Sequence, residues 1–147
     1  MNNKVIEVSN LKKSFQDGNK EILILDNLSL DVYKGDTIAI VGSSGSGKST
    51  FLQLIGGLDK QTSGSILFNN ESLVDFNDNK QSEFRNKNLG FVFQFHHLLS
   101  DFTALENVMF PLLIDRKKEI QIKERAIEIL TRVGLAERLS HYPSKLS

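Results

Sequence analysis

One short stretch of the sequence has the residue types and spacing of a phosphate-binding loop. Residues 42–49 read GSSGSGKS and match the pattern G-x-x-x-x-G-K-[ST] at every fixed position. Glycines let the backbone bring its N–H groups close to phosphate oxygens, because no Cβ stands in the way. Lys48 would place a positive charge at the β- and γ-phosphates, and the Ser49 hydroxyl would be a ligand of Mg²⁺. The residues predicted to contact the nucleotide here are Gly42, Ser43, Ser44, Gly45, Ser46, Gly47, Lys48, Ser49 and Thr50.

The alternative interpretation is a flexible Gly/Ser connector that binds nothing. Multiplying the frequencies of Gly, Lys and Ser plus Thr over the chain gives an accidental match roughly once in a hundred. The flanking sequence also favours a binding loop. The apolar run TIAIV at 37–41 predicts a buried strand directly before it, and a helical pattern begins at Lys48. That helix would direct its positive end at the same anion. We therefore expect ATP or GTP with Mg²⁺ at this loop.

The elements that must position the loop alternate between strand and helix patterns. Alternating or wholly apolar runs predict strands over 4–9, 21–33, 37–41, 65–68 and 89–93. Asp26–Asn27 is a possible interruption within the second of these runs, and turn signals stand at 17–19 and 34–36. Strands that alternate with helices indicate an α/β fold.

Helical spacing is clearest at three places in the chain. The helix from Lys48 is predicted to end at Gly56–Gly57. A polar helix is expected over 78–87, and the chain after residue 93 is helical in pattern to its end. The residues predicted to face inward from the first and last of these helices are Phe51, Leu52, Leu54, Ile55, Ile122, Ala126, Ile129, Leu130 and Val133.

Composition excludes several other classes of protein. The chain has 147 residues, the size of one domain, with 18 basic and 18 acidic side chains, so its formal net charge is zero. This balance argues against binding nucleic acid or an anionic membrane through bulk charge. Without cysteine, neither disulfides nor thiolate chemistry are available. The longest apolar run, 108–114, is far shorter than the roughly 20 residues of a membrane-spanning helix.

The stretch GSSGSGKSTFLQLIGGLDKQTSGSILFNN resembles the start of an ABC transporter ATPase. The resemblance implies a P-loop NTPase fold with an N-terminal antiparallel β subdomain and the beginning of a helical subdomain. It places Gln94, at the end of FVFQ, at the family's Q-loop glutamine, a catalytic residue and a ligand of Mg²⁺ beside Lys48 and Ser49. It also places Phe15 at the aromatic residue that stacks on adenine, where the family more often has Tyr.

The segment from Gln94 to Val108 is the most specific part of the resemblance. It is similar to the ATP-binding subunit of the lipoprotein-releasing transporter, the LolD family, except for Ser100 where proline is more usual. The resemblance implies that Phe95, His96 and His97 contact a membrane-spanning permease. A metal site at the two histidines is disfavoured, because no cysteine or nearby carboxylate pair completes it. The neighbouring apolar side chains are interpreted as core residues: Leu98, Leu99, Phe102 and Leu105.

The resemblance also implies that residues 1–147 are the N-terminal part of one ABC ATPase domain. Residues 1–94 would form the β subdomain and nucleotide-binding core, and 95–147 the partial helical subdomain. Leu146–Ser147 would open the signature sequence, with the Walker B aspartate and catalytic glutamate further on. We expect the chain to bind MgATP without hydrolysing it, and to be marginally stable or prone to aggregate because apolar strand edges are uncovered.

A complete protein of this kind would be a homodimer on the cytoplasmic face of the bacterial inner membrane, attached only through its permease partner. It would couple ATP hydrolysis to the release of lipoproteins. The alternatives are an ATPase of a related system, for macrolide export or cell division, and a nucleotide-binding interaction module that does not hydrolyse ATP.

Overall fold

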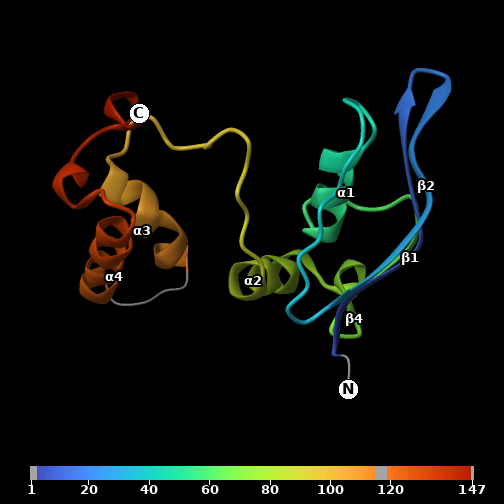
Figure 1. The fold of residues 1–147 in the computed structure, drawn as a ribbon, viewed down its shortest axis with the longest axis horizontal. Coiled ribbons are helices and arrows are strands. Elements are labelled where there is room, and N and C mark those ends of the chain that lie inside the picture. Colours follow the sequence, from blue (N-terminus) through green and yellow to red (C-terminus); the bar gives the residue numbers. More distant parts are fainter. Residues whose placement is uncertain (1–2, 115–118, 147) are drawn as a thin grey trace. The chain divides into compact units, whose positions relative to one another are not determined.

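The computed structural model describes residues 3–114 and 119–146. They form two compact units, residues 1–90 and residues 91–147 (Figure 1). The first unit contains a small antiparallel sheet and two helices. The second unit is helical.

The first unit is organised by a long β-hairpin. Strand β1 (Lys4–Asp17) pairs antiparallel with β2 (Lys20–Tyr33), and the register closes at Asp17↔Lys20. The turn between them depends on Gly18, whose φ of 59° is in the left-handed region. The interruption expected at Asp26–Asn27 is a β-bulge within one continuous strand. The register steps there from Leu11↔Leu28 to Lys13↔Leu25, and Asn27 has a φ of 50°.

Two further strands complete the sheet, in the order β2-β1-β3-β4. Strand β3 (Ser63–Phe68) pairs antiparallel with β1, and the two-residue β4 (Glu71–Ser72) pairs with β3. The connecting Asn69 and Asn70 both have positive φ, 47° and 68°, as a tight hairpin turn requires. The expected antiparallel β subdomain is therefore present.

Helix α1 (Lys48–Ile55) packs on this sheet and forms the core of the unit (Figure 1). Its Phe51 and Leu54 are buried, at 3% and 2% exposure, together with Val8 and Leu11 of β1. The prediction that Leu52 faces inward is wrong, since 51% of this residue is exposed. A helix turns by about 100° per residue, so Leu52 points away from the side that carries Phe51 and Leu54.

The polar helix expected over 78–87 is α2 (Asp78–Asn88), which follows a short 3-10 turn at Leu73–Asp75. Asn77 caps its start, because the Asn77 side chain accepts a hydrogen bond from the N–H of Lys80 at 2.9 Å. Phe84 meets Phe68 of β3 edge to face, with ring centroids 5.5 Å apart. This contact connects α2 to the sheet.

Two predicted strands, 37–41 and 89–93, do not form. Both segments lack regular structure, and Val41 and Val92 are 87% and 103% exposed. A strand buried in a parallel sheet needs hydrogen-bonding neighbours. Within the ranges 3–114 and 119–146, no segment pairs with either of them. Their apolar sequence is thus not sufficient for strand formation.

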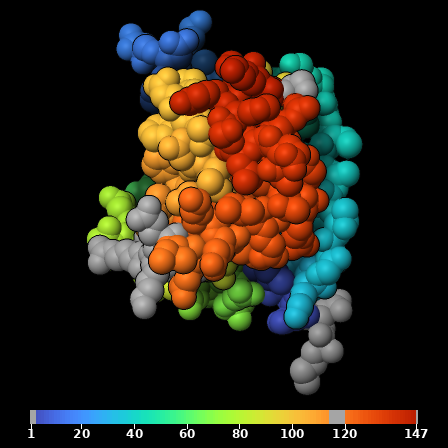
Figure 2. Space-filling view, turned by 90° about the vertical axis from the view of Figure 1, so that its left-hand side faces the viewer, coloured from blue at the N-terminus to red at the C-terminus, as the bar shows by residue number. Residues whose placement is uncertain are grey.

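The second unit contains α3 (Ala104–Ile114) and α4 (Glu119–Arg132), followed by 3-10 turns at Ala136–Arg138 and Pro143–Lys145. Figure 2 shows the surface that these orange and red segments form together. The expected apolar side of α4 is buried at Ile122, Ala126 and Leu130. The prediction that Val133 faces inward is wrong, because this residue lies beyond the last residue of α4 and is 65% exposed.

The backbone N–H groups at the start of α3 find hydrogen-bond acceptors of two kinds, side chains and distant carbonyls. Thr103 and Glu106 form a reciprocal capping box, in which the Glu106 carboxylate accepts from the Thr103 N–H at 2.7 Å and the Thr103 hydroxyl accepts from the Glu106 N–H at 3.3 Å. The carbonyls of His141 and Leu139 accept from the N–H groups of Ala104 and Leu105. Among the helices of the part of the chain that the structure describes, none is long and apolar enough to span a membrane.

Candidate nucleotide-binding site

The predicted phosphate loop folds around the ammonium group of Lys48. This ammonium donates hydrogen bonds to the carbonyl oxygens of Gly42 at 3.0 Å and Ser43 at 2.6 Å, and it lies 3.4 Å from the Ser46 hydroxyl. The Ser46 N–H closes the turn by donating to the Ser43 carbonyl at 3.3 Å. The Lys48 side chain therefore reaches back to the beginning of its own loop, and a phosphate could take the place of these carbonyls as its partner.

Gly47 is the position where this loop meets β2. Its φ is 87°, a conformation that residues with a side chain rarely adopt. A Cβ at Gly47 would also lie 2.9 Å from Leu25 Cδ2 and 3.0 Å from Ile24 Cγ2. The second fixed glycine of the motif is thus required for both its backbone conformation and its close approach to the hairpin.

The start of α1 offers backbone N–H groups to an anion. Its N-cap residue is Gly47, which has no side chain to accept a hydrogen bond, and no acidic residue stands in the first turn. The N–H groups of the first turn of any helix have no partner within the helix. At Lys48, Ser49 and Thr50 they are therefore available to phosphate oxygens, beside the positive end of the helix dipole.

Ser49 has the chemistry of one ligand of a magnesium ion that arrives with a nucleotide. It is exposed on the first turn of α1, next to Lys48. No cluster of three or more His, Asp or Glu occurs in the residues 3–114 and 119–146 that could hold a metal ion by itself. Mg²⁺ in proteins usually keeps several waters and takes ligands from substrate phosphates as well as from one or two side chains.

Phe15 lies on β1, on the same hairpin that the loop contacts. It pairs with Ile22 of β2, and Lys13, two residues earlier, pairs with Leu25, which is one of the side chains next to Gly47. Phe15 is 45% exposed, and the ammonium of Lys13 is 4.6 Å from the centroid of its ring. The fold therefore brings an accessible aromatic ring close to the phosphate loop along the strands.

Lys13, on the same strand as Phe15, is paired with Asp59, although the sequence patterns did not single out either residue. Lys13 is 8% exposed, and its ammonium lies 2.8 Å from Asp59 Oδ2 and 2.7 Å from the carbonyl oxygen of Lys60. Burial of the carboxyl would raise the pKa of Asp59, but hydrogen bonds from Lys13 and from the Lys60 N–H outweigh burial and lower it. The sequence gave no signal of this pair, because a lysine on a strand is usually exposed and its partner lies 46 residues further along the chain.

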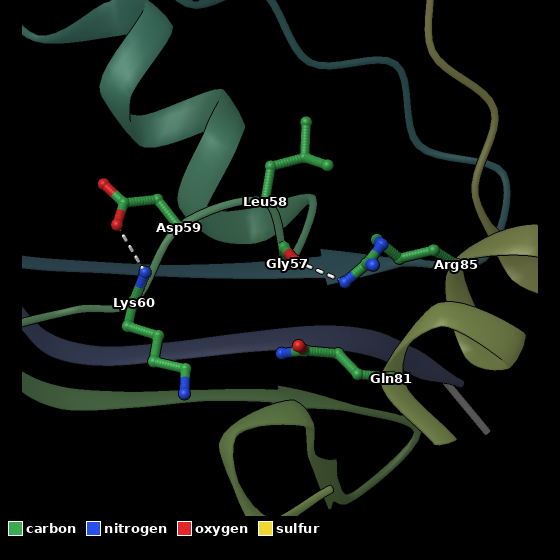
Figure 3. A pocket seen from close by; sticks show the side chains of 6 residues that line it. All are labelled: Gly57, Leu58, Asp59, Lys60, Gln81 and Arg85. Carbon is green, nitrogen blue, oxygen red and sulfur yellow. Dashed lines mark hydrogen bonds between the residues drawn. The ribbon is translucent and has the colours of Figure 1, made fainter. Parts of the chain in front are cut away.

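A polar pocket of about 230 Å³ lies beside the chain that leaves α1. Figure 3 shows its lining by Gly57, Leu58, Asp59, Lys60, Gln81 and Arg85. The Arg85 guanidinium donates to the Gly57 carbonyl at 2.9 Å and to the Ser82 hydroxyl at 3.0 Å. The bond to Gly57 braces α2 against the end of α1, and the bond to Ser82 lies within α2.

The remaining predicted site residues belong to the second unit. Gln94, Phe95, His96 and His97 are all exposed, Phe95 to 70%. His97 has a φ of 48°, and its ring contacts Phe93 edge to face with centroids 5.1 Å apart. The His96 Nδ1 accepts from the N–H of Leu98 at 3.3 Å. All three side chains of the proposed partner surface, Phe95, His96 and His97, are therefore accessible.

The interpretation of Leu98, Leu99 and Phe102 as core residues is wrong, since they are 41%, 46% and 37% exposed. Asn107 of α3 organises this stretch instead. Its side-chain oxygen accepts from the Leu99 N–H at 2.8 Å, and its amide donates to three carbonyls, those of Leu99, Phe102 and Thr103. The stretch is held by polar contacts to the backbone, which apolar periodicity does not reveal.

The strand hairpin, the loop around Lys48 and helix α1 together have the organisation of a P-loop protein. The chain belongs to the ABC transporter family, whose model matches residues 25–147. The neighbouring solved structures agree with this family and extend the match to the N-terminal strands.

Three solved structures illustrate the similarity. The dimeric structure of the ATP-binding cassette MJ0796 bound to ADP and Pi is 36% identical, with a TM-score of 0.87 over 97% of this chain and 63% of that one. A second dimeric structure of MJ0796, described as a bacterial ABC transporter cassette, is 38% identical over the same shares, with a TM-score of 0.86. CbiO1 of Clostridium perfringens, part of the transporter complex cbiONQ, is 28% identical over 99% of this chain and 56% of that one, with a TM-score of 0.79.

The chain thus spans about two thirds or less of the length of these relatives. The fold class predicted from the sequence, a P-loop ABC-type ATPase fold with an antiparallel β subdomain, is confirmed. The roles of the individual site residues stay predictions.

Proposed function

We propose that this chain is the nucleotide-binding portion of an ABC transporter ATPase and that it binds MgATP at the loop 42–50. The observation that carries the proposal is the position of Lys48, at the start of α1, whose ammonium donates hydrogen bonds to the carbonyls of Gly42 and Ser43 at the beginning of the loop. The binding of ADP and Pi by the similar cassette MJ0796 supports the same assignment.

In this proposal the parts of the nucleotide meet different residues. The phosphates contact Lys48 and the N–H groups of the loop, Mg²⁺ takes the Ser49 hydroxyl as one ligand, and adenine stacks on Phe15. Phe15 offers the same aromatic face as tyrosine and lacks only the hydroxyl. Gln94 would add a ligand of Mg²⁺ and help to position the attacking water. Hydrolysis would take place in a dimer of complete cassettes, as the dimeric relatives suggest.

Isothermal titration with MgATP tests the nucleotide site. We expect Lys48→Met to weaken binding at least tenfold, because the charge-assisted contacts to the β- and γ-phosphates are lost. Lys123→Met, on the exposed side of α4, removes the same charge in the second unit and should leave binding unchanged. Equal binding by the starting chain and Lys48→Met would refute the proposed site.

The proposed transport role is the release of lipoproteins from the inner membrane, on the cytoplasmic face, through a permease partner. Its support is the similarity of residues 94–108 to the lipoprotein-releasing branch of the family. Related ATPases for macrolide export or cell division share the loop and GFVFQ but are less similar over Phe95–Leu99. CbiO1, which belongs to a larger transporter complex, supports a partner subunit in general.

The partner surface can be tested by co-expression and co-purification with a membrane-spanning permease of the lipoprotein-releasing branch. We expect Phe95→Ala with His96→Ala to reduce the recovered permease severalfold and to leave MgATP binding intact, because these exposed side chains would lie in the contact. Ile120→Ala, a 75% exposed apolar residue of α4, is the matched control. Full recovery with the Phe95/His96 variant would exclude this surface.

A further inference from the structure

Lys13 is an unusual residue for its position, because it is a lysine in a small core. Among the residues that the structure describes it is the only buried charged side chain, at 8% exposure. Burying an ammonium group is costly unless hydrogen bonds and an opposite charge compensate for it. The partners of Lys13 therefore indicate what the residue does.

These partners join two separate parts of the unit. The ammonium of Lys13, on β1, lies 2.9 and 2.8 Å from the two carboxylate oxygens of Asp59 and 2.7 Å from the Lys60 carbonyl. Thr62 reinforces the connection: its N–H donates to the Lys12 carbonyl, and its hydroxyl accepts from the Ser14 N–H, both at 2.9 Å. The segment 59–62 is thus bound to β1 on both sides of Lys13.

The same ammonium also faces the ring of Phe15. Residues two apart on a strand project to the same side, and the Lys13 nitrogen lies 4.6 Å from the centroid of the Phe15 ring. A cation in this position is attracted to the negative face of the ring. With one face of the ring held in this way and 45% of the residue exposed, Phe15 keeps surface for a further stacking partner.

The arrangement connects the two ends of a nucleotide site. Helix α1 begins at the phosphate loop, and the segment that leaves it reaches Asp59 and Lys60 within five residues of Ile55. Lys13 joins this segment to the strand that carries Phe15. The ion pair between Lys13 and Asp59 therefore adds to the packing of α1 on the sheet a link between the segment that leaves α1 and the strand that carries the aromatic ring.

We propose that Lys13 is a positioning residue for the nucleobase, which holds the Phe15 ring in place and ties it, through Asp59, to the phosphate-loop helix. The inference rests on the proposed function, since it takes ATP as the ligand of this site. It assigns to Lys13 and Asp59 a role in base binding, in addition to their role in packing.

The test compares two ligands that differ only in whether they carry a nucleoside, MgATP and magnesium tripolyphosphate. The variant Lys13→Met/Asp59→Asn removes both charges of the ion pair, so that neither is left without its partner. We expect it to weaken MgATP binding about 3- to 10-fold, and to change tripolyphosphate binding less than twofold. The single variant Lys13→Arg should bind MgATP as the unaltered chain does, because a guanidinium can donate to the same oxygens and lie over the same ring. Lys12→Met, which removes an equal charge one residue away, should have no effect.

The inference would be overturned if the double variant weakened the binding of both ligands equally, or of neither. An ion pair with a purely structural role would affect the binding of both ligands alike. If the double variant does not fold, Asp59→Asn alone is measured, and a loss for MgATP that exceeds the loss for tripolyphosphate is again required. In a Phe15→Leu background, Lys13→Met/Asp59→Asn should add no further loss specific to MgATP. If the unaltered chain binds tripolyphosphate but not MgATP, the inference fails, whereas the proposed binding of phosphates by the loop is supported. If it binds neither, the proposed function fails as well.

Discussion

Strand β1 and the segment 37–41 are similar in sequence and different in structure. Both contain alternating or continuous runs of valine and isoleucine, yet Val8 of β1 is 2% exposed and Val41 is 87% exposed. β1 finds β2 directly after a tight turn and β3 on its other side. No segment of 3–114 or 119–146 pairs with 37–41. Apolar sequence makes a segment a candidate strand, and only a hydrogen-bonding neighbour makes it one.

This difference explains how the phosphate loop is held. The segment before it contributes no strand in the described structure, so the loop depends on helix α1 after it and on the hairpin beside it. Helix α1 packs into the sheet through Phe51 and Leu54, and Gly47 lies against the side chains of Ile24 and Leu25. If contacts between distant segments matter most, stability should depend more on them than on contacts within one turn. Three measurements test this expectation, in order of decreasing effect.

The largest effect is expected from a truncation in the core of the sheet. Leu11→Ala should lower the free energy of unfolding of the first unit by about 2–5 kcal/mol, because Leu11 is fully buried and its removal leaves a cavity. Val41→Ala, in the unpaired segment, should change it by less than about 0.5 kcal/mol. Urea denaturation followed by circular dichroism measures both. Comparable losses would mean that 37–41 packs as well as β1.

An intermediate effect is expected from the pair between Lys13 and Asp59, which are 46 residues apart in sequence. Hydrogen bonds from Lys13 hold the pKa of Asp59 below its ordinary value despite burial. A carboxyl with a lowered folded-state pKa stabilises the fold above its unfolded pKa of about 3.9, and this contribution is lost as the pH falls through the folded value.

The melting temperature of the unaltered chain should therefore fall more steeply below about pH 4 than that of Asp59→Asn, which has no carboxyl to titrate at this position. The difference between the two curves isolates this carboxyl from others, such as Glu106, whose pKa is lowered by its hydrogen bonds to Thr103. Parallel curves through this range would show that the ion pair adds nothing to stability.

The smallest effect is expected where the partners are three residues apart. Thr103→Ala removes the hydroxyl of the capping box at the start of α3 and should cost the second unit about 1 kcal/mol. Thr103→Ser keeps the hydroxyl and should behave nearly as the unaltered chain does. A loss of thermal stability with serine as large as with alanine would indicate that the threonine methyl group, and not the cap, stabilises this helix end.

Much of the local structure was predictable because its causes are local. The turns at Gly18 and Gly35, the end of α1 near Gly56–Gly57, and the apolar side of α4 follow from residue types a few positions apart. The capping box Thr103-x-x-Glu106 has an equally local pattern and could have been recognised from the sequence. Asp26–Asn27 was recognised as irregular, but a bulge could not be told from a break without the pairing of β1 with β2.

The sequence by itself determined the phosphate loop and the family, because both depend on residues that stand in a fixed order along the chain. Only the tertiary structure decided which apolar runs become strands, and that Lys13 is buried against Asp59 beneath Phe15. The physical reason is that hydrogen bonding between strands and the burial of charge depend on partners far away in the sequence, and no local pattern of residues names them.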